Sequence, residues 1–113
     1  MLAVSHSLFD PLGMFTPVCL EPKLCLRKAS VQKLAWDEEV PTEIARKFQK
    51  WCQDIEQLQD IRIPRRVSDV NPGVGEWKLH IFTDASQDAY AAVAFLRVQD
   101  GKEVTVRLVQ AKA

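Results

Sequence analysis

The sequence predicts an α+β protein in which two N-terminal helices precede an incomplete three-stranded antiparallel sheet. Apolar residues recur at steps of three and four between residues 44 and 58, which is the spacing of a helix with one buried face. After residue 76 the composition changes, and three runs rich in β-branched, aromatic and other apolar residues follow. A turn of Gln-Asp-Gly-Lys joins the last two runs, as in a β-hairpin.

The first helix is expected to follow a turn at residues 9 to 13, Phe-Asp-Pro-Leu-Gly. The aspartate of this turn can accept hydrogen bonds from amides ahead of it, and its glycine tolerates positive φ. Thr16 and Pro17 then form a helix start, with the hydroxyl as N-cap and proline at the first helical position. Pro22 lies inside the apolar run that follows. Because an interior proline costs about 3 kcal/mol, we expect a kink or a later helix start there.

The second helix is expected to open near Pro41. Its apolar residues form one stripe, namely Ile44, Phe48, Trp51, Ile55 and Leu58. Its other side carries oppositely charged side chains four residues apart, namely Glu43, Lys47, Lys50 and Asp54. Such a stripe requires a partner surface.

The sheet is expected from three strands in series, at residues 77–83, 91–98 and 104–109. The Ser, Asp, Asn, Pro and Gly residues before them indicate a loop. Without a helical cover, one face of this sheet would expose Val93, Phe95, Val106 and Leu108 beside an open edge. We therefore expect aggregation or a protein partner at the sheet edge.

Composition excludes several classes of protein. Hydrophobic residues make up 47% and charged residues 27% of the chain, a balance typical of a folded domain. Fifteen basic residues are matched by fifteen acidic ones, so no overall positive field attracts nucleic acid. The three cysteines form no C-x-x-C pair and fit a reducing compartment. No signal peptide or membrane span is predicted, and we expect an intracellular protein with no membrane partner.

Three further sets of residues have a functional and a structural interpretation. His6, His80 and the cysteines lack the spacing of a zinc site, and core or surface roles are favoured. Arg62, Arg65 and Arg66 could contact a phosphate backbone, although a solvated turn is favoured. Among the three tryptophans, Trp51 is interpreted as core, and base stacking stays open for Trp77 alone.

A succession of short motifs carries a family resemblance. In chain order they are Phe-Asp-Pro-Leu-Gly and Thr-Pro, Trp-Asp-Glu before Pro41, Trp51, Ile-Pro-Arg at residues 63–65, and Leu-His-Ile-Phe-Thr-Asp-Ala-Ser at residues 79–86, leading to Ala89-Tyr90. The succession resembles Bel/Pao retrotransposon polyproteins, in the stretch known as the Pao retrotransposon peptidase family. The likeness covers nearly the whole chain from about Ser5 onward.

The resemblance implies a division into three parts: a helical connecting region after the reverse transcriptase thumb (1–63), a linker (64–76) and a truncated ribonuclease H-like β-meander (77–113). The sheet would then be the first half of a ribonuclease H fold. That enzyme hydrolyses the RNA strand of an RNA/DNA hybrid with two magnesium ions. By resemblance, Asp84 occupies the position of its essential metal-binding aspartate. From the residues alone, Asp84 is instead a strand-end aspartate that bonds the amides of Ala85 and Ser86.

Two features argue against activity in this chain. Two metal ions about 4 Å apart need several converging carboxylates, and Asp88, Asp100 and Glu103 match none of the family's catalytic positions. The resembling domains also continue into a helix and strands that carry the remaining ligands. We therefore expect Asp84 to be an inherited catalytic and metal position, with no bound cofactor here and magnesium only in the complete domain. No Asp-Thr-Gly or Asp-Ser-Gly loop occurs, so an aspartic protease would lie elsewhere in the parent polyprotein.

Three functions remain open. The first is a polyprotein fragment without catalytic activity by itself. The second is part of a ribonuclease H that acts on RNA/DNA hybrid when its chain is complete. The third is a domesticated interaction module that binds a protein through the exposed sheet edge or the stripe from Ile44 to Leu58.

Overall fold

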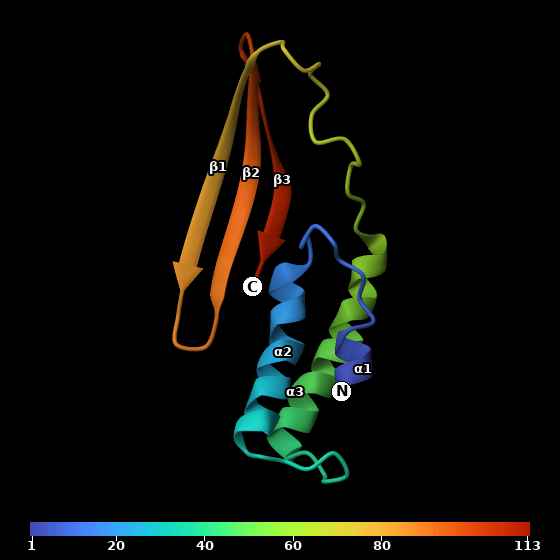
Figure 1. Cartoon of the computed structure of the whole chain (residues 1–113). Coiled ribbons are helices and arrows are strands. Elements are labelled where there is room, and N and C mark those ends of the chain that lie inside the picture. The colour runs from blue at the N-terminus through green and yellow to red at the C-terminus, as the bar shows by residue number, and fades with distance from the viewer. The chain divides into compact units, whose positions relative to one another are not determined.

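The computed structural model describes residues 1–113 and confirms the α+β class, with helices followed by a three-stranded antiparallel sheet (Figure 1). The helices are α1 (Leu2–Ser5), α2 (Thr16–Val31), α3 (Thr42–Asp54) and the 3-10 helix η1 (Ile55–Asp60). The strands are β1 (Glu76–Ala85), β2 (Tyr90–Asp100) and β3 (Glu103–Lys112). None of the helices has the length and apolar character needed to cross a bilayer.

The chain forms two compact units. The helical unit comprises Met1–Phe9 and Pro17–Arg62, and the sheet unit comprises Asp10–Thr16 and Ile63–Ala113. Each unit has its own buried residues: Pro22, Cys25, Ile44 and Trp51 in the helical unit, and Gly13 and Val98 in the sheet unit. The assignment of residues 1–63 to a connecting region stays a prediction.

In the helical unit, α2 continues without a break through Pro22, so the expectation of a later start there was wrong. A proline at position 22 has no N–H for the carbonyl of Val18, four residues earlier. The indole Nε1–H of Trp51, on α3, donates to that carbonyl instead at 2.8 Å. Pro22 itself is fully buried. The long helix is therefore compatible with its proline because a second helix supplies the missing donor.

The apolar stripe is confirmed on α3, while its last two residues, Ile55 and Leu58, lie on the 3-10 helix η1 that follows. Ile44 and Trp51 are buried, Phe48 is half-buried, and the rings of Phe48 and Trp51 lie 5.5 Å apart between centroids. The predicted charge pairs form on the solvent-exposed side of the helix, with Lys47 Nζ 3.6 Å from Glu43 and Lys50 Nζ 2.7 Å from Asp54. Because these pairs are exposed, each contributes only about 0.3 to 0.5 kcal/mol. Burial of the stripe, rather than charge, therefore holds α3 in place.

Cys25 lies on α2 in the core of the helical unit, 2% exposed. Burial raises the pKa of its thiol above the ordinary value because the thiolate loses its hydration. The carboxylate of Glu21 raises the pKa further, while Lys28 and Lys47 partly oppose both effects. A buried thiol held neutral in this way is a packing residue.

The sheet has the strand order β1-β2-β3, so β2 is central and both other strands lie at edges. The predicted meander is confirmed and extends beyond the predicted runs at both ends of each strand. Asp100 and Glu103 pair across a two-residue turn in which Gly101 has a φ of 59°. A shift in the β2–β3 register at Ala94/Phe95 marks a bulge.

The Asp10–Thr16 segment packs on the end of β3. Both carboxylate oxygens of Asp10 accept 2.8 Å hydrogen bonds, from the amides of Met14 and Phe15, as the turn motif predicts. The amide of Ala111 donates to the Leu12 carbonyl at 2.8 Å. Gly13 has a φ of +74°, and a Cβ there would overlap the Ala111 carbonyl oxygen. Position 13 therefore needs glycine both for its backbone conformation and for space.

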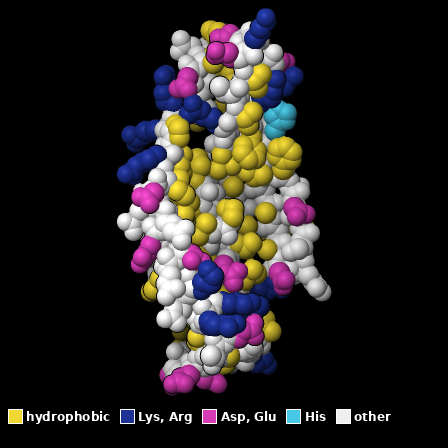
Figure 2. All heavy atoms as spheres, turned by 180° about the vertical axis from the view of Figure 1, so that it is seen from behind, with side chains coloured by type: hydrophobic (Ala, Val, Ile, Leu, Met, Phe, Trp, Pro, Cys, Tyr) yellow, Lys and Arg dark blue, Asp and Glu magenta, His cyan; other side chains and the backbone are white.

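One face of the sheet is apolar and partly open, as predicted. It carries Phe82, Val93, Phe95, Val104, Val106 and Leu108. Phe82 and Phe95 make an edge-to-face contact with 6.1 Å between centroids, yet Phe82 and Val106 remain more than half exposed. Figure 2 shows apolar side chains gathered over the strands. The strands thus expose a group of neighbouring apolar side chains rather than single scattered ones.

We predict that Trp51→Phe lowers the free energy of unfolding of the helical unit by about 1 to 2 kcal/mol. The substitution keeps an aromatic ring but leaves the Val18 carbonyl without its donor. In a Pro22→Ala background the same substitution should cost less, because an alanine at that position supplies a helical N–H. Urea unfolding of the native chain, the two single variants and the double variant gives the free energy that couples the two positions. Equal costs in both backgrounds would contradict the compensation.

Gly13→Ala is expected to destabilise the sheet unit by about 3 kcal/mol or more, because strain at positive φ adds to the overlap with Ala111. Gly73→Ala is the matched control: its φ is +89° and nothing lies within 4 Å of its added Cβ. It should cost about 1 kcal/mol. Hydrogen exchange at the Ala111 amide measures the loss of its hydrogen bond to the Leu12 carbonyl. Unchanged protection of that amide in Gly13→Ala would refute the close approach of Gly13 to Ala111.

The raised pKa of Cys25 predicts a loss of stability in alkaline solution. Its contribution is fully present below the ordinary thiol pKa of about 8.5. It is lost as the pH rises from there through the higher pKa of the folded state, because the unfolded chain releases its proton first. Unfolding free energies between pH 7 and pH 10 should fall less steeply in Cys25→Ala than in the native chain, with Cys52→Ala as control. Parallel curves for all three proteins would be inconsistent with this origin.

Candidate functional site

Asp84 is the penultimate residue of β1, opposite Ala91 on β2. Its side chain is exposed, and Oδ1 accepts a hydrogen bond from the Ala85 amide at 2.9 Å. The second expected bond, to the Ser86 amide, is absent because that amide donates to the Ala89 carbonyl at 2.8 Å. The Ser86 hydroxyl also accepts from the Ala89 amide at 3.2 Å. A tight hairpin therefore orders the backbone just beyond Asp84 and leaves its second carboxylate oxygen without a hydrogen bond from the protein.

Asp88 lies in the hairpin loop next to Asp84, but Asp100 and Glu103 do not converge on Asp84. Asp100 and Glu103 flank the opposite hairpin, and the length of β2 from Ala91 to Asp100 is about 30 Å at roughly 3.3 Å per residue. No group of three or more His, Cys, Asp or Glu side chains in the chain is placed to hold a metal ion. A pair of magnesium ions needs several shared carboxylates. The residues present therefore do not fit a two-metal centre.

The sheet unit also contains a pocket of about 620 Å³, within the size range of ligand sites. Its walls are mainly apolar and come from three segments: Asp10, Pro11, Leu12, Met14 and Phe15; Ile63, Pro64, Arg65, Arg66 and Val67; and Arg107, Leu108 and Val109. Asp10 is used by the turn, and Arg107 donates to the Arg66 carbonyl at 3.1 Å and to Asp69 at 2.6 Å. Asp10 and Arg107 are therefore engaged in holding the turn and the loop, and no His, Cys, Ser, Thr, Tyr or Lys side chain lines the pocket.

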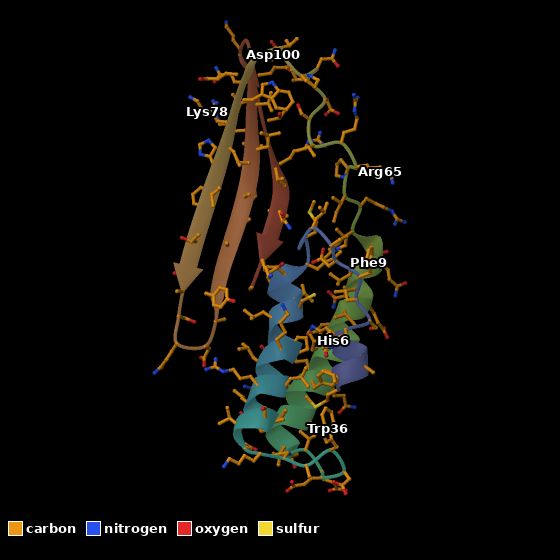
Figure 3. All side chains as sticks on the ribbon, in the orientation of Figure 1. His6, Phe9, Trp36, Arg65, Lys78 and Asp100 are labelled. Atoms are coloured by element: carbon orange, nitrogen blue, oxygen red, sulfur yellow. The ribbon has the colours of Figure 1, made fainter.

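The side chains considered for nucleic-acid contact lie before β1 and at its start. Arg62, Arg65 and Arg66 are exposed, and Arg65 lies on the segment between η1 and β1 (Figure 3). Trp77, left open from the sequence, is 37% exposed and its indole donates to the Val74 carbonyl at 2.7 Å. Trp77 is therefore held by a local bond as well as by its strand.

Trp36, for which base stacking was not favoured from the sequence, is largely exposed, as are Phe9 and Tyr90. It is 95% exposed in the loop between α2 and α3 (Figure 3). The break in apolar periodicity at this position was the available signal. Three acidic residues follow it directly in the sequence, at positions 37 to 39. Stacking on a nucleic acid there would bring phosphates close to three carboxylates, which is electrostatically unfavourable.

The arrangement of the strands indicates the kind of domain to which the chain belongs. Helices followed by an antiparallel β-meander, with an exposed aspartate at the penultimate position of the first strand, form an α+β arrangement consistent with a partial ribonuclease H-like fold. The family comparison makes this specific: residues 1–113 match the model of the Pao retrotransposon-like RNaseH-like domain, and the chain belongs to that family. It is thus a retrotransposon-derived region. Searches of curated proteins and of solved structures found no match.

Proposed function

We propose that this chain is the part of a Bel/Pao polyprotein that runs from the reverse transcriptase connection into the first strands of the ribonuclease H domain, and that it has no catalytic activity by itself. The family match along residues 1–113 supports the origin. The observation that carries the inactivity is that no three His, Cys, Asp or Glu side chains are placed to hold a metal ion, with Asp84 about 30 Å along β2 from the carboxylates of the opposite hairpin.

In a complete domain, Asp84 would be one of several metal-binding carboxylates. Its exposed position at the end of β1 supports this role, because further segments could place their carboxylates against it. Magnesium bound there would stabilise the attacking and leaving oxygens during hydrolysis of the RNA strand of a hybrid. The parent polyprotein would also carry a reverse transcriptase and, elsewhere, an aspartic protease. This chain would contribute the metal-binding aspartate and the β1–β2 hairpin that orders the backbone beside it.

Cleavage of a labelled RNA/DNA hybrid in millimolar magnesium tests this proposal. We expect no cleavage above background for the 113-residue chain, and the same result for Asp84→Asn. If the parental reading frame continues past Ala113, the extended protein should cleave the hybrid and lose that activity on Asp84→Asn. Magnesium-dependent cleavage by the 113-residue chain that disappears in Asp84→Asn would overturn the proposed inactivity.

A second candidate function, a domesticated protein-interaction module, has one observation in its favour. All ten residues of β1 are exposed, and β1 pairs with a neighbour along only one of its edges. An unpaired strand edge offers backbone donors and acceptors to another chain. A stable and specific complex at low protein concentration would favour this function over that of an inactive fragment.

A further inference from the structure

The sheet unit is built from two stretches of the chain that lie far apart in the sequence. Asp10–Thr16, here named the clip segment, belongs to this unit together with Ile63–Ala113. The chain therefore passes between the helical unit and the sheet unit three times, after Phe9, after Thr16 and after Arg62. A unit that is connected in this way cannot be excised by one cut of the backbone.

The clip segment is ordered internally and is bonded to β3. Besides the two bonds that the Asp10 carboxylate accepts, the Gly13 amide donates to the Asp10 carbonyl at 3.2 Å and the Thr16 amide donates to the Gly13 carbonyl at 3.1 Å. The Ala111 amide donates at 2.8 Å to the Leu12 carbonyl rather than to β2. Gly13 is buried, and its lack of a side chain lets the two backbones approach closely. The clip segment therefore supplies β3 with a backbone partner on the side away from β2.

Apolar side chains of the clip segment and of β3 also share one lining. Met14 and Phe15 of the clip segment and Leu108 and Val109 of β3 border the same pocket of the sheet unit. All four side chains are half-buried. Without the clip segment, Leu108 and Val109 would lose cover and expose more apolar surface to water, which is unfavourable. Apolar burial therefore adds to the backbone bond in holding the clip segment on β3.

The loop before β1 is attached to β3 in its first half and makes local bonds in its second half. Arg107 on β3 donates to the Arg66 carbonyl at 3.1 Å and to the Asp69 carboxylate at 2.6 Å. Asn71–Val74 is a local turn, closed by a 3.1 Å bond between the backbones of its two end residues. Nothing lies within 4 Å of a Cβ added to Gly73. A cut beside Gly73 would therefore open the local turn and leave the bonds of Arg107 in place.

We propose that the clip segment is an integral part of the ribonuclease H-like sheet, and that proteolytic cleavage of the loop before β1 gives a two-chain complex rather than a free sheet. Hydrolysis of that one peptide bond adds a water and leaves a carboxylate and an amine as new ends. The N-terminal piece would keep hold of β3 through the bond between Leu12 and Ala111, the bonds of Arg107 and the shared apolar lining.

Such a device would matter for how the region is processed. A protease that cuts the loop would leave the strand that carries Asp84 bound to the N-terminal piece, so cleavage would change the covalent connection without releasing the sheet. The inference goes beyond the proposed function and does not depend on ribonuclease chemistry. It is in keeping with a family match that runs through both units, over residues 1–113.

Cleavage of the full 113-residue chain at an engineered site tests the inference. A short recognition sequence for a site-specific protease is inserted after Gly73, and a denaturing gel verifies the cut. On a size-exclusion column in native buffer the two pieces should elute together, and circular dichroism should be the same before and after cutting. Dilution until the two pieces separate gives the Kd of their complex.

Substitutions in the clip segment assign the attachment to it. Gly13→Ala should raise the Kd of the two pieces about a hundredfold, the factor that corresponds to a loss of about 3 kcal/mol. Gly101→Ala is the matched control, because position 101 also has a positive φ, of 59°, but nothing lies within 4 Å of its added Cβ. This control should leave the Kd unchanged. Asp10→Ala removes the two bonds that order the turn and creates no overlap, and it should raise the Kd about tenfold.

Circular dichroism of each uncut variant shows whether it folds, and Asp10→Ala carries the test if Gly13→Ala does not fold before cutting. Separation of the two pieces as soon as the unsubstituted chain is cut would overturn the proposal. A Kd that the clip-segment variants leave unchanged would overturn it as well, because the attachment would then lie outside the clip segment.

Discussion

The hydrogen bond from the Trp51 indole to the Val18 carbonyl makes the observed packing of the helical unit possible. It supplies the donor that Pro22 removes, and so allows α2 to run unbroken from Thr16 to Val31. With α2 intact, Pro22 and Cys25 are buried beside the stripe of α3, and the tryptophan that makes the bond is itself a core residue. One side chain therefore serves two purposes: apolar burial and satisfaction of a backbone acceptor.

The sheet unit depends on a different kind of constraint, the close approach of two backbones. The turn at Asp10 to Gly13 is held by bonds to its own carboxylate, and it presents the Leu12 carbonyl to the Ala111 amide. This contact joins segments near the two ends of the chain and requires glycine at position 13. Arg107, on the same strand, ties the loop before β1 through Arg66 and Asp69. The end of β3 is thus anchored, whereas the outer edge of β1 is open.

This asymmetry bears on function. The feature that links the chain to ribonuclease H chemistry, Asp84, and the feature that invites a partner, the β1 edge, belong to the same strand. A family origin in a retrotransposon region and a present role in binding are therefore compatible.

The types of the elements could be predicted from the sequence because they rest on local physics: the three-and-four periodicity of α3, the turn at Asp10 to Gly13, and the three β-rich runs with a glycine turn. The motif succession that indicated the family is likewise a property of the sequence. How Pro22 is accommodated could not be predicted in this way, since the compensating donor lies 29 positions away at Trp51. The docking of Asp10–Thr16 on β3, and the separation of Asp84 from the carboxylates of the opposite hairpin, also emerged only from the folded chain, because backbone pairing is a relation between segments that local patterns leave unspecified.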